Sequence, residues 1–415
     1  MSKRPEMFLP EQWPSYYSKS KGVNVWDLDG NKYTDMSIFG VGACILGFCD
    51  EDVDTAVISA VKNGNMTTLN PPEEVELAEL LCEIHPWAKR VRYARSGGEI
   101  LAIAIRIARA ATGKNRVAFC GYHGWSDWYI SSNLSEDANL DGHLLPGLKP
   151  LGIPRELTNT AIPFNYNKIK ELISIVDTYN DIGVIIMEPV RNYGPEDDFL
   201  KKVRDIADKI GAVLIFDEVT SGWRINEGGI HLTMGVEPDM AAYAKGMSNG
   251  YPMAALIGRS GLMEVAQDTF ISSTYWTDRI GPTAALATIR KFRKCNAGDY
   301  LNRLGKILQC GIRKMAERHL IKLEIIGIPP LTHMSFQYGE MNSKLKTLFI
   351  QEMLERNYIA SLSVYLSYSH NEVVLEEYFN ALDDVFGILA DSIENDTLDK
   401  KIKGPLAHSS FKRLT

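Results

Sequence analysis

Four short segments of the chain combine residue types that could carry chemistry. The first, Ser96-Gly97-Gly98-Glu99, lies between a predicted strand and a predicted helix. Paired glycines let backbone N–H groups approach an anion, and the following helix adds the positive end of its dipole. Taken alone, this segment fits a tight turn as well as it fits a phosphate site.

The second segment, Gly121-Tyr122-His123-Gly124, follows a predicted strand that ends at Phe119. Open α/β sheets bind ligands at the carboxyl ends of their strands, where Tyr122 could stack on a flat cofactor ring. The alternative is that both side chains pack beneath a loop, and this segment alone slightly favours that packing.

The third and fourth segments place charged residues after apolar stretches. Asp217 and Glu218 close the buried stretch 211–216, where two acids are costly unless a cation pairs with them, so they mark a site. Lys245 closes the mostly apolar stretch 238–244. Burial lowers the pKa of such a lysine and frees its amine to form a Schiff base, although a surface lysine is the favoured alternative for this segment alone.

The combination of these four segments favours one cofactor. Pyridoxal 5'-phosphate requires a lysine for its aldehyde, an acid that keeps its pyridine nitrogen protonated, and a site for its phosphate. No metal is expected, because the cysteines form no CxxC pair and His85, His123 and His370 lack the spacing of metal ligands.

The elements that must position these segments alternate along the chain. Helical patterns are predicted at 73–84, 99–111 and 198–210, and strands at 91–93, 116–119, 184–187, 213–216 and 253–257. This alternation indicates an α/β domain with a parallel or mixed sheet covered on both faces. Residues 22–37 are predicted to form a hairpin around Asp29-Gly30-Asn31.

After residue 290 the pattern changes to long helices at 300–319, 342–356 and 372–395, with short strands at 323–326 and 334–338. This predicts a smaller α+β domain. We expect residues 1–55 to be an N-terminal segment of that small domain, 56–290 to be the large cofactor-binding domain, and 291–415 to be the rest of the small domain and a tail. The glycines at 40, 42 and 47 miss the dinucleotide-binding spacing and are interpreted as close backbone packing.

Composition limits the classes of function. The 415 residues include 45 Lys+Arg and 52 Asp+Glu, for a net charge of −7, and 45% are hydrophobic, which is a globular balance. The mild acidity disfavours nucleic-acid binding. No apolar run approaches the roughly 20 residues of a membrane helix, the N-terminus has no signal-peptide core, and the cysteines are widely spaced. A cytoplasmic protein with no membrane association is therefore expected.

Several pieces of the sequence resemble class III pyridoxal-phosphate aminotransferases, nearest to the glutamate-1-semialdehyde 2,1-aminomutase-like branch. They occur in family order between about Val25 and Arg293: VWDLDGNKYTDM, VRYARSGGE with AIRIARAATGK, GYHG, MEPV, LIFDEVTSGWR, PDMAAYAKGMSNGYPMAALIG and FISSTYWTDRIGPTAALATI. The resemblance implies the aspartate aminotransferase-like fold, fold type I, with a large mixed-sheet α/β domain and a smaller α+β domain.

The resemblance also implies roles for residues. Lys245 would hold the cofactor as a Schiff base and shuttle a proton, Asp217 would pair with the pyridinium nitrogen, and Val219 would support the ring face opposite Tyr122. Thr274 and the neighbouring Ser273 would reach the phosphate in a second subunit, which implies a homodimer with a shared active site. The implied site residues are Ser96, Gly97, Gly98, Tyr122, His123, Glu188, Asp217, Val219, Lys245, Ser273 and Thr274.

Departures from the family pattern lie in the phosphate turn and the substrate segments. Gly98 stands where the family usually has threonine, which removes one hydroxyl contact worth about 1 kcal/mol. Residues 270–278 and 13–17 differ from the aminomutase, so the substrate pocket is expected to have changed. Candidates for acceptor recognition, with ordinary surface or interface packing as the alternative, are Trp125, Arg191, Trp276 and Arg279.

The predicted function is transfer of an amino group from a small-molecule donor, with L-glutamate favoured, to a keto or aldehyde acceptor that includes sugar-derived compounds. An intramolecular aminomutase of the glutamate-1-semialdehyde type is the alternative, because it uses the same lysine and aspartate. A non-catalytic scaffold is disfavoured, since Lys245 and Asp217 are both intact.

Overall fold

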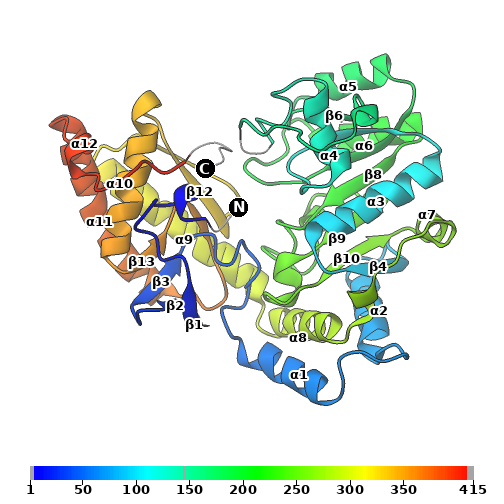
Figure 1. The fold of residues 1–415 in the computed structure, drawn as a ribbon, viewed down its shortest axis with the longest axis horizontal. Helices are drawn as coiled ribbons and strands as arrows, with labels where there is room; N and C mark the ends of the chain where they lie inside the picture. Colours follow the sequence, from blue (N-terminus) through cyan, green and yellow to red (C-terminus); the bar gives the residue numbers. More distant parts are fainter. Residues whose placement is uncertain (1–3, 144–145, 409–415) are drawn as a thin grey trace. The chain divides into compact units, whose positions relative to one another are not determined.

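The computed structural model describes residues 4–143 and 146–408. Its packing divides the chain into two compact units, one made of residues 4–51 and 294–408 and the other of residues 52–293 (Figure 1). No helix of these described residues is long and apolar enough to cross a bilayer.

The unit of residues 52–293 is built on a seven-stranded mixed sheet with the order β4-β10-β9-β8-β7-β5-β6. Strand β10 runs antiparallel to both of its neighbours, and the other adjacent pairs are parallel. The strands are β4 (Arg90–Ala94), β5 (Arg116–Cys120), β6 (Ala161–Pro163), β7 (Ile182–Met187), β8 (Val213–Asp217), β9 (Met240–Tyr243) and β10 (Ala254–Gly258).

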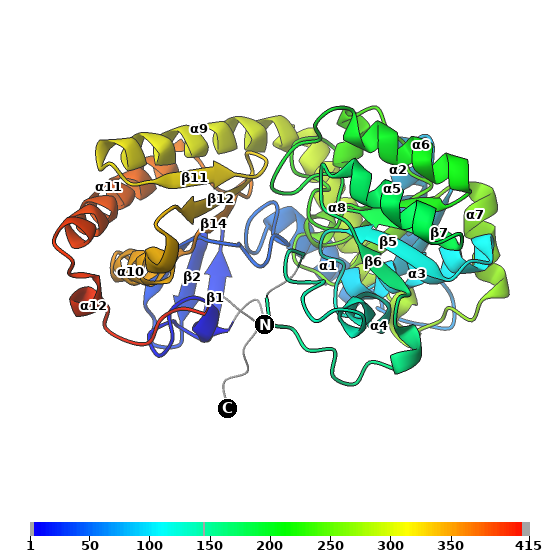
Figure 2. The same cartoon turned by 90° about the horizontal axis from the view of Figure 1, so that it is seen from above.

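Helices cover both faces of this sheet, as Figure 2 shows. Helix α3 (Gly97–Thr112) packs over one face, where alternate residues of the strands, such as Phe119, Ile186 and Ile215, join its core. Helix α6 (Phe199–Ile210) contacts β7 and β8. The remaining helices of the unit are α1 (Glu51–Lys62), α2 (Pro72–Ile84), α4 (Asp127–Ile130), α5 (Ile169–Thr178), α7 (Ser260–Glu264) and α8 (Ile280–Lys294).

The unit that joins the two ends of the chain is α+β. Strand β13 (Tyr358–Ala360) pairs in parallel with β3 (Lys32–Met36), which completes a sheet with β1 (Tyr17–Lys21) and β2 (Asn24–Asp27). A second antiparallel sheet holds β11 (Leu323–Ile326), β12 (Leu331–Phe336) and β14 (Ser363–Tyr365). Its helices are α9 (Ala297–Arg318), α10 (Asn342–Glu355), α11 (Glu372–Glu394) and α12 (Leu398–Lys401).

Some sequence-based boundaries move in the structure. The hairpin is confirmed by the antiparallel pairing of β2 with β3, and the Asp27 carboxylate accepts hydrogen bonds from the backbone N–H groups of Asp29 and Asn31 in its turn. Helix α3 begins at Gly97, two residues earlier than predicted, because the Ser96 side chain caps it by accepting a hydrogen bond from Glu99 N. The strand predicted at 334–338 lies at Leu331–Phe336.

Candidate active site

The carboxyl ends of four adjacent parallel strands bring the chemical segments to one edge of the large sheet. Tyr122 and His123 follow β5, Glu188 follows β7, Asp217 is the last residue of β8, and Lys245 comes two residues after β9. Since these strands lie side by side in the order β9-β8-β7-β5, residues separated by more than a hundred positions in the sequence share one site.

Asp217 is held as a buried carboxylate by two donors. Its Oδ2 lies 2.8 Å from His123 Nδ1, and its Oδ1 accepts a hydrogen bond of 3.1 Å from Val219 N. The other ring nitrogen of His123 lies 3.1 Å from the carbonyl oxygen of Cys120. The His123 ring is therefore held between the Asp217 side chain and a backbone carbonyl oxygen, which fixes its orientation beside Asp217.

Lys245 is the amine of the site. Burial lowers its pKa to about 8, against the opposing effect of Glu188 and with further lowering by Arg224 and Arg191. Its Nζ donates a hydrogen bond of 2.9 Å to Thr220 Oγ1. A lowered pKa increases the fraction of the neutral, nucleophilic amine near neutral pH.

The amino end of α3 forms a cradle beside these groups. The first hydrogen bond inside this end of the helix runs from Ile100 N to Ser96 O, so the N–H groups of Gly97 and Gly98 precede the helical ladder. A Cβ atom on Gly97 would lie 3.1 Å from Val219 Cγ1, which shows how closely the helix approaches the turn after β8. Backbone donors at a helix amino end suit a phosphate group.

The loop after β5 closes another side of the same region. A Cβ atom on Gly124 would lie 3.2 Å from Gly98 Cα, so this loop touches the α3 cradle directly. Glu188 is almost fully buried, and its Oε2 accepts hydrogen bonds from Tyr122 N at 3.1 Å and from Arg191 Nη1 at 3.2 Å. Tyr122 is 37% exposed, so part of this residue is accessible from the site.

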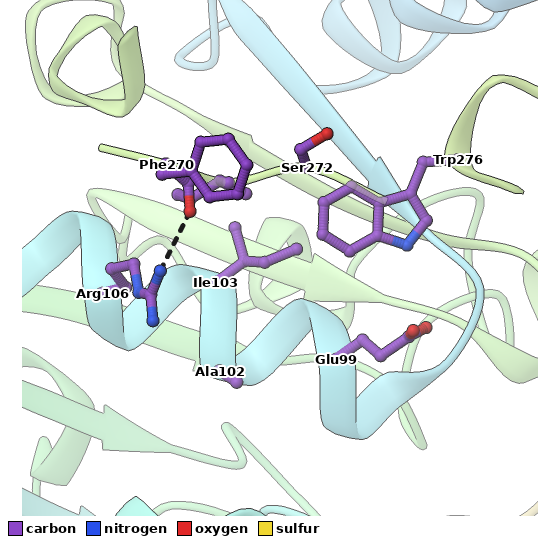
Figure 3. A pocket seen from close by; sticks show the side chains of 8 residues that line it. Glu99, Ala102, Ile103, Arg106, Phe270, Ser272 and Trp276 are labelled. Atoms are coloured by element: carbon purple, nitrogen blue, oxygen red, sulfur yellow. Dashed lines mark hydrogen bonds between the residues drawn. The ribbon is translucent and has the colours of Figure 1, made fainter. Parts of the chain in front are cut away.

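Ser273 and Thr274 lie on a different segment, residues 269–279, and both are exposed. The segment is fastened to α3 by a hydrogen bond from Arg106 Nη1 to Phe270 O at 3.0 Å, and to the start of α3 by an ion pair of Arg95 with Asp278. Between the segment and α3 lies a hollow of about 270 Å³ (Figure 3), lined by Glu99, Ala102, Ile103, Arg106, Phe270, Ile271, Ser272 and Trp276.

The four candidates for acceptor recognition have different surroundings. Trp125 is 75% exposed, and its indole lies against Gly98 in the cradle. Arg191 forms the ion pair with Glu188, and Trp276 packs against the core beside α3. Arg279 forms a two-pronged ion pair with Glu73, with its Nη2 2.7 Å from Oε1, so its charge is already neutralised within the chain.

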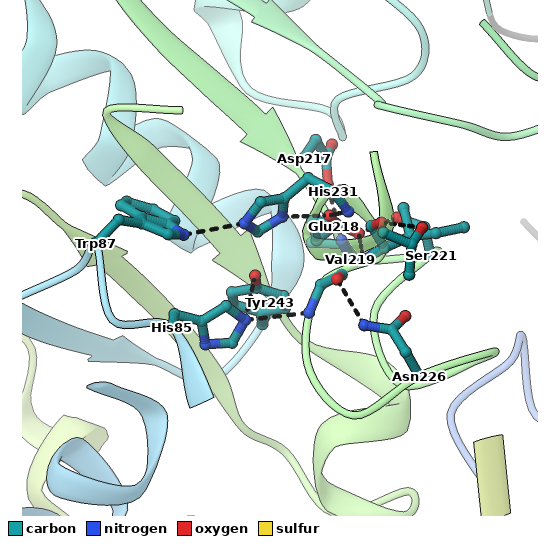
Figure 4. A network of polar contacts seen from close by, with 12 residues as sticks. His85, Trp87, Asp217, Glu218, Val219, Ser221, Asn226, His231 and Tyr243 are labelled. Atoms are coloured by element: carbon teal, nitrogen blue, oxygen red, sulfur yellow. Dashed lines mark hydrogen bonds and ion pairs between the residues drawn. The ribbon is translucent and has the colours of Figure 1, made fainter. Parts of the chain in front are cut away.

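Sequence reasoning missed Thr220 and the separate role of Glu218. It treated Asp217 and Glu218 as a pair that needs a cation, but consecutive residues at a strand end point to opposite sides. In the structure Asp217 contacts His123, whereas Glu218 contacts His231, 2.8 Å away (Figure 4). The alternating direction of side chains along a strand could have predicted that Asp217 and Glu218 have different partners.

Comparisons with known proteins identify the family to which the chain belongs. The profile of the family described as Aminotransferase class-III matches residues 10–327. The chain is 31% identical over 366 residues to the 3-aminobutyryl-CoA aminotransferase of Cloacimonas acidaminovorans, covering 86% of this chain and 84% of that relative. It is 30% identical over 396 residues to the glutamate-1-semialdehyde 2,1-aminomutase of Persephonella marina, covering 90% and 91%.

Among solved structures, the FumI protein of Sphingopyxis sp. MTA144 in its "PLP internal aldimine form" has a TM-score of 0.85 at 22% identity, with 94% of this chain and 92% of that chain covered. The chain therefore belongs to the class III aminotransferase family.

Membership of this family confirms the predicted fold type I architecture, the enzymatic class and the cofactor, pyridoxal 5'-phosphate. The residues present fit that cofactor. The partly buried amine of Lys245 suits its aldehyde, the Asp217 carboxylate suits its ring nitrogen, and the amino end of α3 suits its phosphate.

Proposed function

We propose that this enzyme transfers an amino group from L-glutamate to a keto or aldehyde acceptor, with sugar-derived carbonyl compounds among the acceptors. The observation that carries this proposal is the convergence of a partly buried amine, a buried carboxylate and a helix amino end at one sheet edge. Aminotransferases use small-molecule amino donors and carbonyl acceptors. For this enzyme we propose L-glutamate as the donor and a keto or aldehyde compound as the acceptor.

The proposed roles follow from the contacts of each residue. The bound cofactor supplies an electron sink for the bond being broken at the substrate carbon. Lys245 would hold the cofactor aldehyde, and its amine would carry a proton to and from the substrate carbon. Asp217, fixed by His123 and Val219 N, keeps a proton on the cofactor ring nitrogen.

The remaining site residues bind rather than react. The N–H groups of Gly97 and Gly98, with Ser96, would hold the phosphate, and Tyr122 and Val219 would support the cofactor ring. Glu188 would bind near the hydroxyl of the cofactor. Support for these positions comes from the short approaches of Gly97 to Val219 and of Glu188 to Tyr122 N.

An intramolecular aminomutase is the second candidate, supported by the 30% identity with the Persephonella marina aminomutase over 90% of the chain. A mutase moves an amine within one substrate and needs no external donor, whereas a transferase exchanges its amino group with a free donor.

The absorbance spectrum of the purified enzyme, before and after L-glutamate is added, tests the proposal. A yellow band that gives way to a near-ultraviolet band is expected, because the cofactor then carries the donor's amino group. A yellow band that persists with glutamate would exclude glutamate as donor and favour the mutase, with L-alanine and other amines as the next donors to test.

We also propose that the enzyme is a homodimer in which Ser273 and Thr274 contact the phosphate bound by the partner subunit. Their exposure, and the fastening of their segment to α3, support this assignment. Thr274→Ala should weaken cofactor affinity about 10- to 150-fold, the equivalent of one hydrogen bond to a charged group.

Equilibrium titration of the apoenzyme with pyridoxal phosphate measures this effect, and Thr277→Ala, an exposed change in the same turn, is the matched control. A monomer with full activity at micromolar concentration would contradict the shared site.

A further inference from the structure

Behind the active site, the carboxylate of Glu218 is buried and surrounded by hydrogen-bond donors. His231 Nδ1 lies 2.8 Å from Oε1, and the backbone N–H groups of His231 and Ile230 donate at 3.0 and 3.1 Å. The Ser221 hydroxyl donates to the same carboxylate through a short contact. The four donors are a ring nitrogen of His231, two backbone N–H groups and one hydroxyl, so the carboxylate of Glu218 is held by hydrogen bonds on both of its oxygens.

The proton positions in this network follow from its contacts (Figure 4). Trp87 Nε1 can only donate, and it lies 3.1 Å from His231 Nε2, so that nitrogen accepts and the ring proton of His231 is on Nδ1, facing Glu218. Burial would raise the pKa of the Glu218 carboxyl, but hydrogen bonds from His231 and Ser221 outweigh it, and the pKa is lowered. Glu218 is therefore an anion that accepts a hydrogen bond from His231, which in turn accepts one from Trp87.

A second histidine extends the network to the strand that precedes Lys245. His85 Nδ1 lies 2.9 Å from Leu81 O and carries the proton, so Nε2 accepts hydrogen bonds from Gly229 N and from the Tyr243 hydroxyl at 2.9 Å. Burial lowers the pKa of His85 to about 4, and the ring is neutral. Tyr243 ends β9, two residues before Lys245.

The turn after Glu218 connects this network to the amine. Gly222 N donates a hydrogen bond of 2.8 Å to Glu218 O. A Cβ atom on Gly222 would lie 2.9 Å from Tyr243 Cδ1, so the turn packs closely against Tyr243. Within this turn, Thr220 Oγ1 accepts the hydrogen bond from Lys245 Nζ. Both ends of the contact between Thr220 and Lys245 are thus tied to the buried network.

We propose that Glu218 is a positioning residue for Lys245. By accepting hydrogen bonds from Ser221 and from residues 230–231, its carboxylate fixes the turn 219–222 and so places the Thr220 hydroxyl against the lysine amine. Trp87 and His231 make this arrangement specific for a carboxylate, because the His231 ring nitrogen and the two backbone N–H groups around it can only donate. This inference rests on the proposed role of Lys245 as the cofactor-binding amine.

The decisive substitution is Glu218→Gln, which keeps the shape and replaces one acceptor oxygen by a donor. The amide N–H groups then face donors, and His231 cannot switch its ring proton because Trp87 occupies Nε2. We expect the turn to shift and water to reach the amine. The proton affinity of Lys245 should then rise about three- to tenfold, towards that of a solvated lysine.

The readout is the reactivity of Lys245 with acetic anhydride in the apoenzyme across pH, quantified by mass spectrometry of its peptide. The charged groups around the amine, Glu188, Asp217, Arg191 and Arg224, are unchanged by the substitution. The wild type should show a midpoint near the lowered pKa of about 8. This readout needs no cofactor, so it separates failure of this inference from failure of the proposed function.

A second substitution should reverse the effect. In the double variant Glu218→Gln with Trp87→Phe, the indole N–H is gone, and His231 can move its proton to Nε2 and accept from the new amide. The Lys245 titration should return to within about twofold of the wild type. If Glu218→Gln acted only by lowering stability, the second substitution would make the defect worse. A Lys245 titration that does not recover in the double variant would therefore overturn the proposed hydrogen-bond network.

Two further variants complete the test. Glu227→Gln makes the same change in the same loop, where Glu227 pairs with Arg293 at 2.8 Å, and it should leave the Lys245 titration unchanged. If Glu218→Gln does not fold, Ser221→Ala removes only the donor that joins the carboxylate to the turn, and it should raise the proton affinity of Lys245 in the same direction. An unchanged titration in whichever of these two variants folds would overturn the proposal, whatever its effect on Tm.

Discussion

Replacement of Lys245 by alanine is expected to lower turnover by at least about 10⁴-fold, the upper range for loss of a positioned acid–base group, because covalent attachment of the cofactor is lost with it. The variant should still bind pyridoxal phosphate non-covalently, since Asp217, Tyr122 and the α3 cradle are unchanged. Borohydride reduction followed by peptide mapping should fix the cofactor to Lys245 in the wild type and to no peptide in the variant. Near-normal turnover would refute the assignment of Lys245 as the amine that binds the cofactor.

The pH dependence of cofactor loading gives an independent check on the same amine. Only the neutral amine attacks the aldehyde, and the pKa of Lys245 is about 8. The rate of loading should therefore rise roughly tenfold per pH unit below pH 7 and level off above pH 8. A lysine with an ordinary pKa would continue to gain rate up to about pH 10. Stopped-flow absorbance of the apoenzyme mixed with pyridoxal phosphate distinguishes the two curves.

The second large effect is expected for Asp217→Asn. The new amide cannot carry the negative charge that keeps the cofactor ring nitrogen protonated, and its N–H group would face the protonated Nδ1 of His123. Loss of one member of a buried charge pair costs about 2–5 kcal/mol, so turnover should fall roughly 30- to 5,000-fold. Single-turnover kinetics with the donor measure the effect on the chemical step.

The matched control for this variant is Asp137→Asn, the same substitution at an exposed position of the same unit. It should leave turnover and the cofactor spectrum unchanged. If Asp217→Asn behaved like this control, with wild-type kinetics and an intact fold, the proposed contact between Asp217 and the ring nitrogen would be refuted.

The fold was predictable to the extent that its signals are local. The apolar runs of β7 and β8 indicate buried strands, and the two acids at the end of β8, Asp217 and Glu218, mark its exit from the core. The order of the sheet brings Lys245 near Asp217 without any further assumption, because adjacent parallel strands end at the same edge. The resemblance to a family added the partner-directed role of Thr274, which no local pattern indicates.

The buried network was not predictable, because its contacts join distant parts of the chain. Trp87 and His231 are 144 residues apart, and His231 is 13 residues from Glu218, with no periodic pattern linking them. A pair of acids at a strand end predicts that their negative charges must be compensated. It does not indicate whether a cation or a set of hydrogen-bond donors compensates them. Only the packed structure separates the surroundings of Asp217 from those of Glu218.

The backbone at Lys245 has a consequence for laboratory evolution of this enzyme. Its φ of 50° is in the left-handed region, which costs a residue with a side chain about 1–3 kcal/mol. Its ammonium adds a further penalty on the order of 3 kcal/mol near neutral pH, because the pKa of about 8 lies below that of the unfolded chain, and this penalty is relieved only as pH rises from 8 towards 10.5. Glycine at this position removes both costs. A library of apoenzyme variants sorted by thermal tolerance alone would therefore be enriched in proteins that have lost this amine, so such a screen must be coupled to a readout of activity.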